Sequence, residues 1–281
     1  MSFSQIKSYA KINLALNIVG KTTNLHKIES IIAFIDLYDL IFIKKIKSKK
    51  NDISFSGKFS RNIGKKNTVS ELMKILEKKK FLKDKKFHIK VDKRIPSQAG
   101  LGGGSMNAAR ILKYFIKKKI IKIKKKQIFK ISKMIGSDVI LGLNSFNTIL
   151  TSKNKIKIFT KYKKIHTLIV KPKFGCSTKE IYSKVKNFER PKLNRPNKNM
   201  FNLDYLKKMN NNLELIVFSK YPTLKKIKLF IEKSLNPVFV RMSGSGSVLV
   251  AYFKSKKICE LAKKKFNKKY KNYWCIASKT I

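Results

Sequence analysis

Cysteine and histidine are scarce in this chain of 281 residues, with three of each. The cysteines, Cys176, Cys259 and Cys275, are odd in number and form no Cys-x-x-Cys pair. This excludes a disulfide-stapled scaffold and favours a reducing, cytoplasmic compartment. The histidines are scattered without zinc or haem spacing, so we predict no metal-ligating residue in the chain.

Long hydrophobic runs are also missing. No apolar run reaches the roughly 18 residues of a membrane span, and the N-terminal MSFSQIKSYAKINL lacks the apolar centre of a signal peptide. We therefore expect no membrane partner. Hydrophobic residues still make up 43% of the chain, which is enough for a buried core in one large domain or two of ordinary size.

Acidic residues are few: 15 Asp and Glu stand against 67 Lys and Arg, which gives a formal net charge of +52. Such a charge can indicate binding to nucleic acid. The lysines, however, are spread from end to end, and no aromatic RNA-recognition motif is present. The abundance of Lys, Ile, Asn and Phe is typical of AT-rich coding. We expect no nucleic-acid partner, and a basic nucleic-acid-binding protein is the alternative function.

The apolar pattern mixes strands and helices along the chain, which is typical of an α+β fold. We expect strands within 5–20, 31–44, 87–91, 146–158, 165–172 and 273–277, and a strand, glycine turn and strand over 238–253. We expect helices within 67–81, from Ser105 to about Ile135, and within 203–219, 223–235 and 255–269. The polar stretch 187–202 is expected to be a loop.

Glycine is unevenly distributed, because four of the 12 glycines fall within PSQAGLGGGSMNAA, which runs from Pro96 to Ala109. This segment lies between a predicted strand and a predicted helix. It is not a Walker A loop, since no lysine follows Gly104, and it is not a dinucleotide fingerprint, since Ser105 replaces the last glycine. Two interpretations stay open: a backbone cradle for a phosphate at a helix N-terminus, or a tight strand-to-helix turn.

The wider wording of this segment resembles the second motif of the GHMP kinase superfamily. Its triple glycine is most similar to the branch that phosphorylates 4-diphosphocytidyl-2-C-methyl-D-erythritol. AKINLALNIVG, IGSDVI, KFGCSTKEIY and RMSGSGSVLVAYF resemble further motifs of that branch, in the same order along the chain. The resemblance implies a two-domain GHMP kinase fold. Residues 1–160 would form a ribosomal-protein-S5-like α/β domain that binds ATP, and residues 161–281 a ferredoxin-like α+β domain.

The resemblance also implies the reaction. ATP, with Mg²⁺, would phosphorylate the 2-hydroxyl of this cytidine-diphosphate sugar alcohol in the non-mevalonate isoprenoid pathway. The small-molecule substrate and ATP are the expected partners of a monomer or homodimer. A GHMP kinase with another alcohol acceptor, such as homoserine or mevalonate, is the enzyme alternative.

Two residues are implied to be catalytic. Asp138 is the only carboxylate between Asp92 and Glu180, in a stretch rich in lysine that favours its ionised form. From the residues alone, it could equally be a capping aspartate after Gly136. The resemblance implies that Asp138 takes the proton of the substrate hydroxyl, and that Lys11 of AKINL stabilises charge on the transferred phosphoryl group.

The binding residues follow from the same motifs. ATP is expected to contact Pro96, Ala99, Gly100, Leu101, Gly102, Gly103, Gly104 and Ser105, with Asn67 and Lys93 beside the adenine and ribose. The acceptor is expected to contact Asn13, His26, Tyr182, Gly244, Ser245 and Gly246. For Tyr182, a place in the core is the alternative, and for the last three, a plain β-turn.

The chain departs from the family pattern at three of its motif positions. Leu25 replaces a tyrosine before His26, Met106 replaces a serine, and Ile140 replaces a proline after Asp138-Val. We expect these departures to affect affinity and rate more than the type of reaction.

Overall fold

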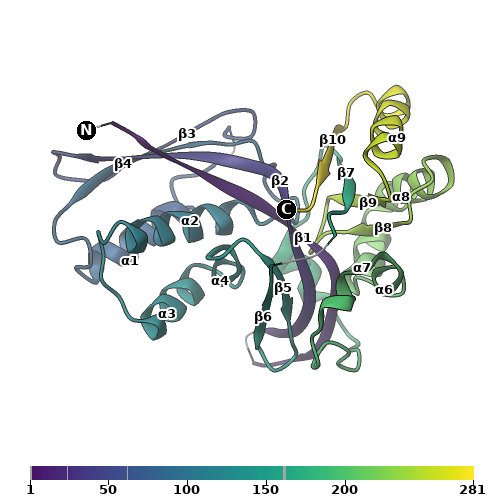
Figure 1. Cartoon of the computed structure of the whole chain (residues 1–281), viewed down its shortest axis with the longest axis horizontal. Helices are drawn as coiled ribbons and strands as arrows, with labels where there is room; N and C mark the ends of the chain where they lie inside the picture. The colour runs from purple at the N-terminus through teal and green to yellow at the C-terminus, as the bar shows by residue number, and fades with distance from the viewer. Residues whose placement is uncertain (1, 24, 62, 161–162) are drawn as a thin grey trace. The chain divides into compact units, whose positions relative to one another are not determined.

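The computed structural model describes residues 2–23, 25–61, 63–160 and 163–281 (Figure 1). Two β-sheets and helices between their strands confirm the predicted mixed α+β class. The chain divides into two compact units that are not continuous in sequence. Unit 1 comprises Met1–Ala10, Leu37–Ser97 and Gly102–Ser145, and unit 2 comprises Lys11–Asp36, Gln98–Leu101 and Phe146–Ile281. The predicted domains, 1–160 and 161–281, are continuous segments of the chain. This division stays a prediction.

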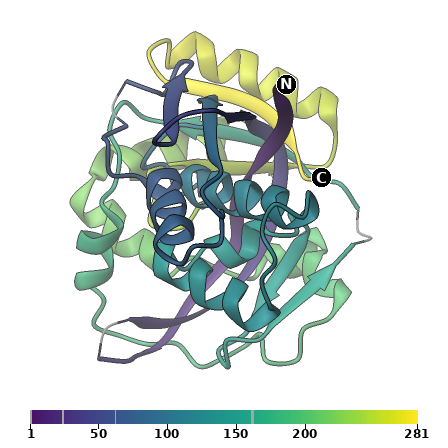
Figure 2. The same cartoon turned by 90° about the vertical axis from the view of Figure 1, so that its left-hand side faces the viewer.

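Unit 1 contains one layer of strands with helices on one side (Figures 1 and 2). Its strands are the first part of β1 (Ser4–Lys21), the second part of β2 (His26–Ile46), β3 (Asp52–Ser56) and β4 (Lys86–Asp92). Its helices are α1 (Thr68–Lys78), α2 (Gly103–Lys117), α3 (Lys125–Ile135) and α4 (Val139–Gly142). Strand β4 pairs antiparallel with β2 and parallel with β3.

The core of unit 1 lies between these strands and α1 and α2. The apolar spacing that predicts α1 is the spacing that buries it, because residues three and four apart share one helix face. The buried side chains are Ile41 and Ile43 of β2, Ile89 and Val91 of β4, Val69, Leu72, Met73 and Leu76 of α1, and Ala108, Ile111, Leu112 and Phe115 of α2.

Unit 2 contains a four-stranded antiparallel sheet in the order β10-β7-β9-β8. Its strands are β7 (His166–Lys171), β8 (Phe239–Met242), β9 (Leu249–Phe253) and β10 (Trp274–Lys279). The first connection holds α5 (Thr178–Ser183), α6 (Leu203–Lys207), α7 (Leu213–Lys220) and α8 (Pro222–Ser234), and the last holds α9 (Lys256–Lys269). This β-α-β-β-α-β order, with the last strand beside the first, confirms the predicted ferredoxin-like arrangement.

One face of this sheet packs against helices. Alternate residues of a strand share a face, and Leu168, Val170, Leu249, Ala251 and Phe253 are buried with apolar side chains of α8 and α9. Unit 2 also holds the remaining parts of β1 and β2, together with β5 (Asn147–Leu150) and β6 (Ile156–Phe159). Strand β5 pairs antiparallel with both β2 and β6.

The structure differs from the predicted elements in several places. The predicted helix 203–219 is broken into α6 and α7, because the side chain of Asn211, between them, bonds to distant backbone instead of allowing the helix to continue. The helix after the glycine segment begins at Gly103, not at Ser105. The short strand β3 and helix α5 were not predicted. The predicted loop 187–202 is irregular except for a 3₁₀ turn, Lys198–Phe201.

Within the described parts of the chain, no helix is long and apolar enough to cross a membrane. The same residues contain no group of three His, Cys, Asp or Glu side chains that could hold a metal ion.

Candidate active site

Strand β1 places Lys11 and Asn13 on one face of the sheet, since they are two residues apart. The Nζ of Lys11 donates to Oδ1 of Asn13 at 2.7 Å, and Nδ2 of Asn13 donates to Oγ of Ser30 at 2.8 Å. Lys11 and Asn13 are each only 4% exposed. A buried ammonium group is costly unless it is hydrogen-bonded, so this network holds the charge of Lys11 in one place.

Hydrogen bonds join β1 to two distant glycine segments of unit 2. The N–H of Lys11 donates to the carbonyl of Leu101 at 3.0 Å. The N–H of Asn13 donates to Oγ of Ser243 at 3.1 Å, and this hydroxyl donates to the carbonyl of Gly100 at 2.9 Å. The structure therefore brings together the AKINL segment, the first half of the glycine loop and the SGSGS turn.

The conformation of the backbone requires glycine at position 100. Its φ of +73° lies in the left-handed region, where a side chain is strained. Gly244 and Gly246 of the SGSGS turn also have positive φ, at +56° and +86°. Between them, Ser245 is buried, and its hydroxyl shares a hydrogen bond of 2.9 Å with Oγ1 of Thr178.

The start of α2 has no side-chain cap. Its N-cap residue is Gly102, with φ of +67°, which has no side chain to accept from the first turn. The first N–H groups of a helix have no partner within the helix and attract anions. The carbonyl of Gly104 accepts from Oγ1 of Thr68 at 2.7 Å, which fixes this turn against α1.

Lys93 is a buried cation beside this turn. Its Nζ lies 3.2 Å from where a β-carbon of Gly103 would stand, and it forms an ion pair with Asp39 of β2. Asp39 is fully buried and also accepts from the N–H groups of Arg94 and Ile95, each at 2.8 Å, and from Nδ2 of Asn107 at 2.9 Å. Sequence reasoning missed Asp39, which alternates with apolar residues in β2 and has no recognisable motif around it.

Several side chains that are predicted to bind ATP are buried or hydrogen-bonded within the protein itself. Pro96, Ala99 and Leu101 are buried, so they shape the loop and offer only backbone to a ligand. The side chain of Asn67 caps α1: its Oδ1 accepts from the N–H groups of Val69 and Ser70, each at 3.0 Å. This cap is a structural use of Asn67, and its contact with a nucleotide stays a prediction.

Asp138 stands at the N-cap position of α4, but its side chain does not cap the helix. This half-buried carboxylate therefore does not cap α4, contrary to the capping interpretation. The loop before it lies close to the first turn of α2, since Oγ of Ser105 is 3.8 Å from where a β-carbon of Gly136 would stand. Unit 1 thus places the loop of Asp138 beside the end of the glycine segment.

Met106 serves the packing between α2 and α4. Its side chain is 1% exposed, and its Sδ lies 2.9 Å from where a β-carbon of Gly142 would stand. The methionine that replaces the family's serine therefore fills the interior of unit 1. Ile140, the other departure in this region, lies within α4 itself.

His26 is surrounded by aromatic rings in unit 2. Its ring centroid is 5.3 Å from that of Tyr182 and 6.5 Å from that of Phe188. Burial, and secondarily the charge of Lys21, lower the pKa of His26 below its usual 6.5, so the ring is neutral at pH 7. Its Nε2 is buried and has no hydrogen-bond partner among the described residues.

The two rings beside His26 differ in exposure. Tyr182 packs partly against the core of unit 2, whereas Phe188 is 48% exposed. Leu25, where the family has tyrosine, is 69% exposed. Sequence reasoning missed Phe188 because it falls in the polar stretch 187–202, where its only signal is that it is aromatic.

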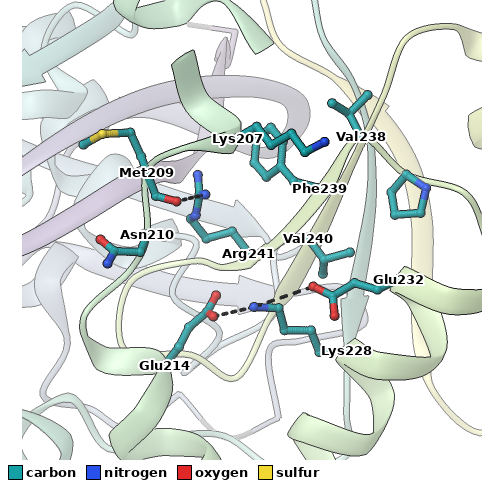
Figure 3. A pocket seen from close by; sticks show the side chains of 11 residues that line it. Lys207, Met209, Asn210, Glu214, Lys228, Glu232, Val238, Phe239, Val240 and Arg241 are labelled. Carbon is teal, nitrogen blue, oxygen red and sulfur yellow. Dashed lines mark hydrogen bonds and ion pairs between the residues drawn. The ribbon is translucent and has the colours of Figure 1, made fainter. Parts of the chain in front are cut away.

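A separate cavity of about 390 Å³ in unit 2 contains none of the predicted site residues (Figure 3). Lys228 pairs with Glu214 at 2.6 Å and with Glu232 at 3.8 Å. The guanidinium of Arg241 donates to the carbonyls of Met209 and Leu14. Because these charges are paired within the protein, we assign the cavity no part in the site.

Comparison with known proteins identifies the family. Residues 67–150 match the family model described as GHMP kinases N terminal domain. The chain is 55% identical to the 4-diphosphocytidyl-2-C-methyl-D-erythritol kinase of Pelagibacter ubique (strain HTCC1062), over 100% of both chains. It is 33% identical to the protein of the same name from Clostridium beijerinckii (strain ATCC 51743 / NCIMB 8052), over 95% of this chain and 97% of the relative.

Solved structures agree at the level of the fold. A crystal structure of 4-(cytidine 5'-diphospho)-2C-methyl-D-erythritol kinase superposes with a TM-score of 0.78 at 20% identity, over 99% of this chain and 100% of the other. The mevalonate kinase of Methanococcus jannaschii superposes with a TM-score of 0.62 at 14% identity, over 100% and 99%. Taken with the relatives in sequence, these matches mean that the chain belongs to the GHMP kinase family, among the 4-diphosphocytidyl-2-C-methyl-D-erythritol kinases.

Proposed function

We propose that this chain transfers the γ-phosphoryl group of ATP to the 2-hydroxyl of 4-diphosphocytidyl-2-C-methyl-D-erythritol, a step of the non-mevalonate route to isoprenoid precursors. The observation that carries the proposal is the 55% identity, over the full length, with a kinase of that name. The homoserine kinase of Cytophaga hutchinsonii ATCC 33406 and the mevalonate kinase of Methanococcus jannaschii each match at only 14% identity, which favours this acceptor over theirs.

The glycine segment holds the phosphates of ATP in this proposal. The uncapped first turn of α2, entered through the left-handed Gly102, fits an anion, and the charge of Lys93 beside Gly103 adds to the attraction. Mg²⁺ bound with the nucleotide would neutralise charge on its phosphates. Nucleotide oxygens and water would hold this cation, so no side chain of the chain is needed as its ligand.

Asp138 and Lys11 carry the chemistry. The carboxylate of Asp138 accepts the proton of the 2-hydroxyl as its oxygen bonds to the γ-phosphorus and the bond from phosphorus to the ADP oxygen breaks. Such a base contributes about 10²–10⁴ in rate. The ammonium of Lys11, which Asn13 fixes, stabilises the charge of the transferring group. The transfer is direct, without a covalent enzyme intermediate.

The acceptor is held in unit 2. The neutral ring of His26 has a buried, unpartnered Nε2 that can bond to the edge of cytosine. The exposed ring of Phe188 offers a face for the base to stack on, and Tyr182 supports His26 from the core side. In the turn from Gly244 to Gly246, the N–H of Gly246 donates to the carbonyl of Ser243 at 3.0 Å, so the backbone N–H groups of Gly244 and Ser245 are the ones that would meet the diphosphate.

The state and place of the protein are also proposals. We infer a monomer or homodimer, to be measured by light scattering. A cytoplasmic location is supported by the three cysteines, which are free thiols in the structure.

A direct assay tests the function. Purified protein is incubated with ATP, Mg²⁺ and the proposed acceptor, and ADP and the phosphorylated product are measured. Homoserine and mevalonate are supplied at equal concentration in competition. Exclusive phosphorylation of the cytidine compound supports the proposal, and its absence while another alcohol is phosphorylated overturns the choice of acceptor.

A further inference from the structure

We propose that Ser243 is a positioning residue whose hydroxyl fixes the strand that carries Lys11 to the glycine loop. The inference rests on the proposed function, since it takes Lys11 and the loop to be the groups that act on the γ-phosphate. Ser243 itself touches neither substrate nor nucleotide in this account. It sets the place of the ammonium relative to the backbone around Gly100.

The geometry around Ser243 is a chain of hydrogen bonds. Its Oγ accepts from the N–H of Asn13 at 3.1 Å and donates to the carbonyl of Gly100 at 2.9 Å. Asn13 in turn holds Nζ of Lys11 at 2.7 Å through its Oδ1. The backbone bond from Lys11 to Leu101, at 3.0 Å, runs beside this link. A shift of Asn13 therefore moves the partner of the ammonium.

The turn that carries Ser243 is itself fixed. Nδ2 of Asn211 donates to the carbonyls of Met242 and Gly244, each at 2.8 Å, on both sides of Ser243. The N–H of Ser243 donates to the carbonyl of Val248 at 3.0 Å. Ser243 and Asn211 are 0% and 3% exposed. The hydroxyl thus projects from a rigid turn and can serve as a fixed point for β1.

A hydroxyl group is needed at this position to accept from the N–H of Asn13 and to donate to the carbonyl of Gly100. A serine or threonine oxygen accepts one hydrogen bond while it donates another. Alanine leaves the N–H of Asn13 and the carbonyl of Gly100 without this partner in a buried place, and both segments then shift to find others. Threonine keeps the oxygen and restores the link.

The same turn supplies a matched control. Ser247 is also fully buried, and its Oγ donates to the carbonyl of Phe174 at 2.8 Å. Among the described residues, Ser243 and not Ser247 bonds to Asn13 and Gly100. Replacing Ser247 with alanine therefore removes a comparable buried hydrogen bond without releasing the strand of Lys11.

The test compares Ser243→Ala, Ser243→Thr and Ser247→Ala with the unaltered chain in the kinase assay. We expect Ser243→Ala to lower kcat about 10- to 100-fold, with KM for the acceptor changed less than about threefold. Threonine should recover most of kcat, and Ser247→Ala should keep it within about threefold at a similar Tm. Equal losses in Ser243→Ala and Ser247→Ala, or a threonine variant no better than alanine, would overturn the proposal.

A second measurement does not depend on turnover. Amide hydrogen exchange at Lys11, Asn13 and Leu101 should speed up in Ser243→Ala and stay unchanged in Ser247→Ala. Unchanged exchange at these amides in Ser243→Ala overturns the link. If the unaltered chain has no kinase activity, the proposed function fails, while the exchange result still decides whether Ser243 holds β1 to the loop.

Discussion

A β-carbon on Gly100 would lie 1.9 Å from the carbonyl oxygen of Ser243. No real side chain approaches backbone that closely, and the oxygen belongs to a turn that Asn211 holds in place. The bare backbone at position 100 is therefore a condition for the glycine loop and the SGSGS turn to meet.

Gly100→Ala should destabilise the protein by about 2–4 kcal/mol, because alanine is strained in the left-handed conformation and its β-carbon clashes with the carbonyl of Ser243. Urea unfolding measures this change. Gly64→Ala is the control, since nothing lies within 4 Å of a β-carbon there and its φ is ordinary. Equal stability of the two variants would contradict the close approach.

Asp138→Asn should retain nucleotide binding and lose about 10²–10⁴ in kcat, since the amide cannot take the proton. Calorimetric titration with a nonhydrolysable ATP analogue and steady-state kinetics separate the two effects. Asp84→Asn, an exposed aspartate of the same unit, should keep normal kcat. An unchanged rate for Asp138→Asn would remove this carboxylate from the mechanism.

Asp39→Asn should cost about 3–5 kcal/mol of stability, because it leaves the ammonium of Lys93 buried without its counter-charge. Adding Lys93→Met should recover part of that loss. The pair of Glu77 and Lys86 is partly exposed, so Glu77→Gln should cost at most about 1 kcal/mol. Chemical denaturation of all three variants gives the comparison, and a full recovery is not required for the buried charge to be the cause.

The pKa of His26 should be measured below 6.5 by NMR titration. Between this lowered value and 6.5, the unfolded chain binds more protons than the folded one, so the contribution of His26 to stability rises with pH and is complete above 6.5. Lys21→Met should raise the pKa of His26, because the charge of Lys21 is its second cause. Lys27→Met, at a neighbouring exposed position, should leave it in place.

Much of the fold could be predicted because its signals are local. The burial of Val69, Leu72 and Leu76 follows from helical spacing, and the strands around the SGSGS turn follow from apolar runs. The break before α7 could not be predicted, since Asn211 bonds to residues 31 and 33 positions away. Likewise β3 is short, and its partner β4 lies well beyond it in the chain.

The candidate site was predictable only where a motif marks it. Lys11 is one of 67 Lys and Arg, and only the AKINL wording singles it out. Asp39 pairs with a lysine 54 positions away, and Phe188 approaches His26 only through the fold. No local pattern carries either relationship.

Two residues of α2 exclude a side chain from Gly142 of α4, because a β-carbon there would lie 2.7 Å from that of Ala109 and 2.9 Å from Sδ of Met106. Serine in place of Met106 would therefore open a void under the helix. Alanine at position 142 could not close this void, since the β-carbon of Ala109 would still stand in its way.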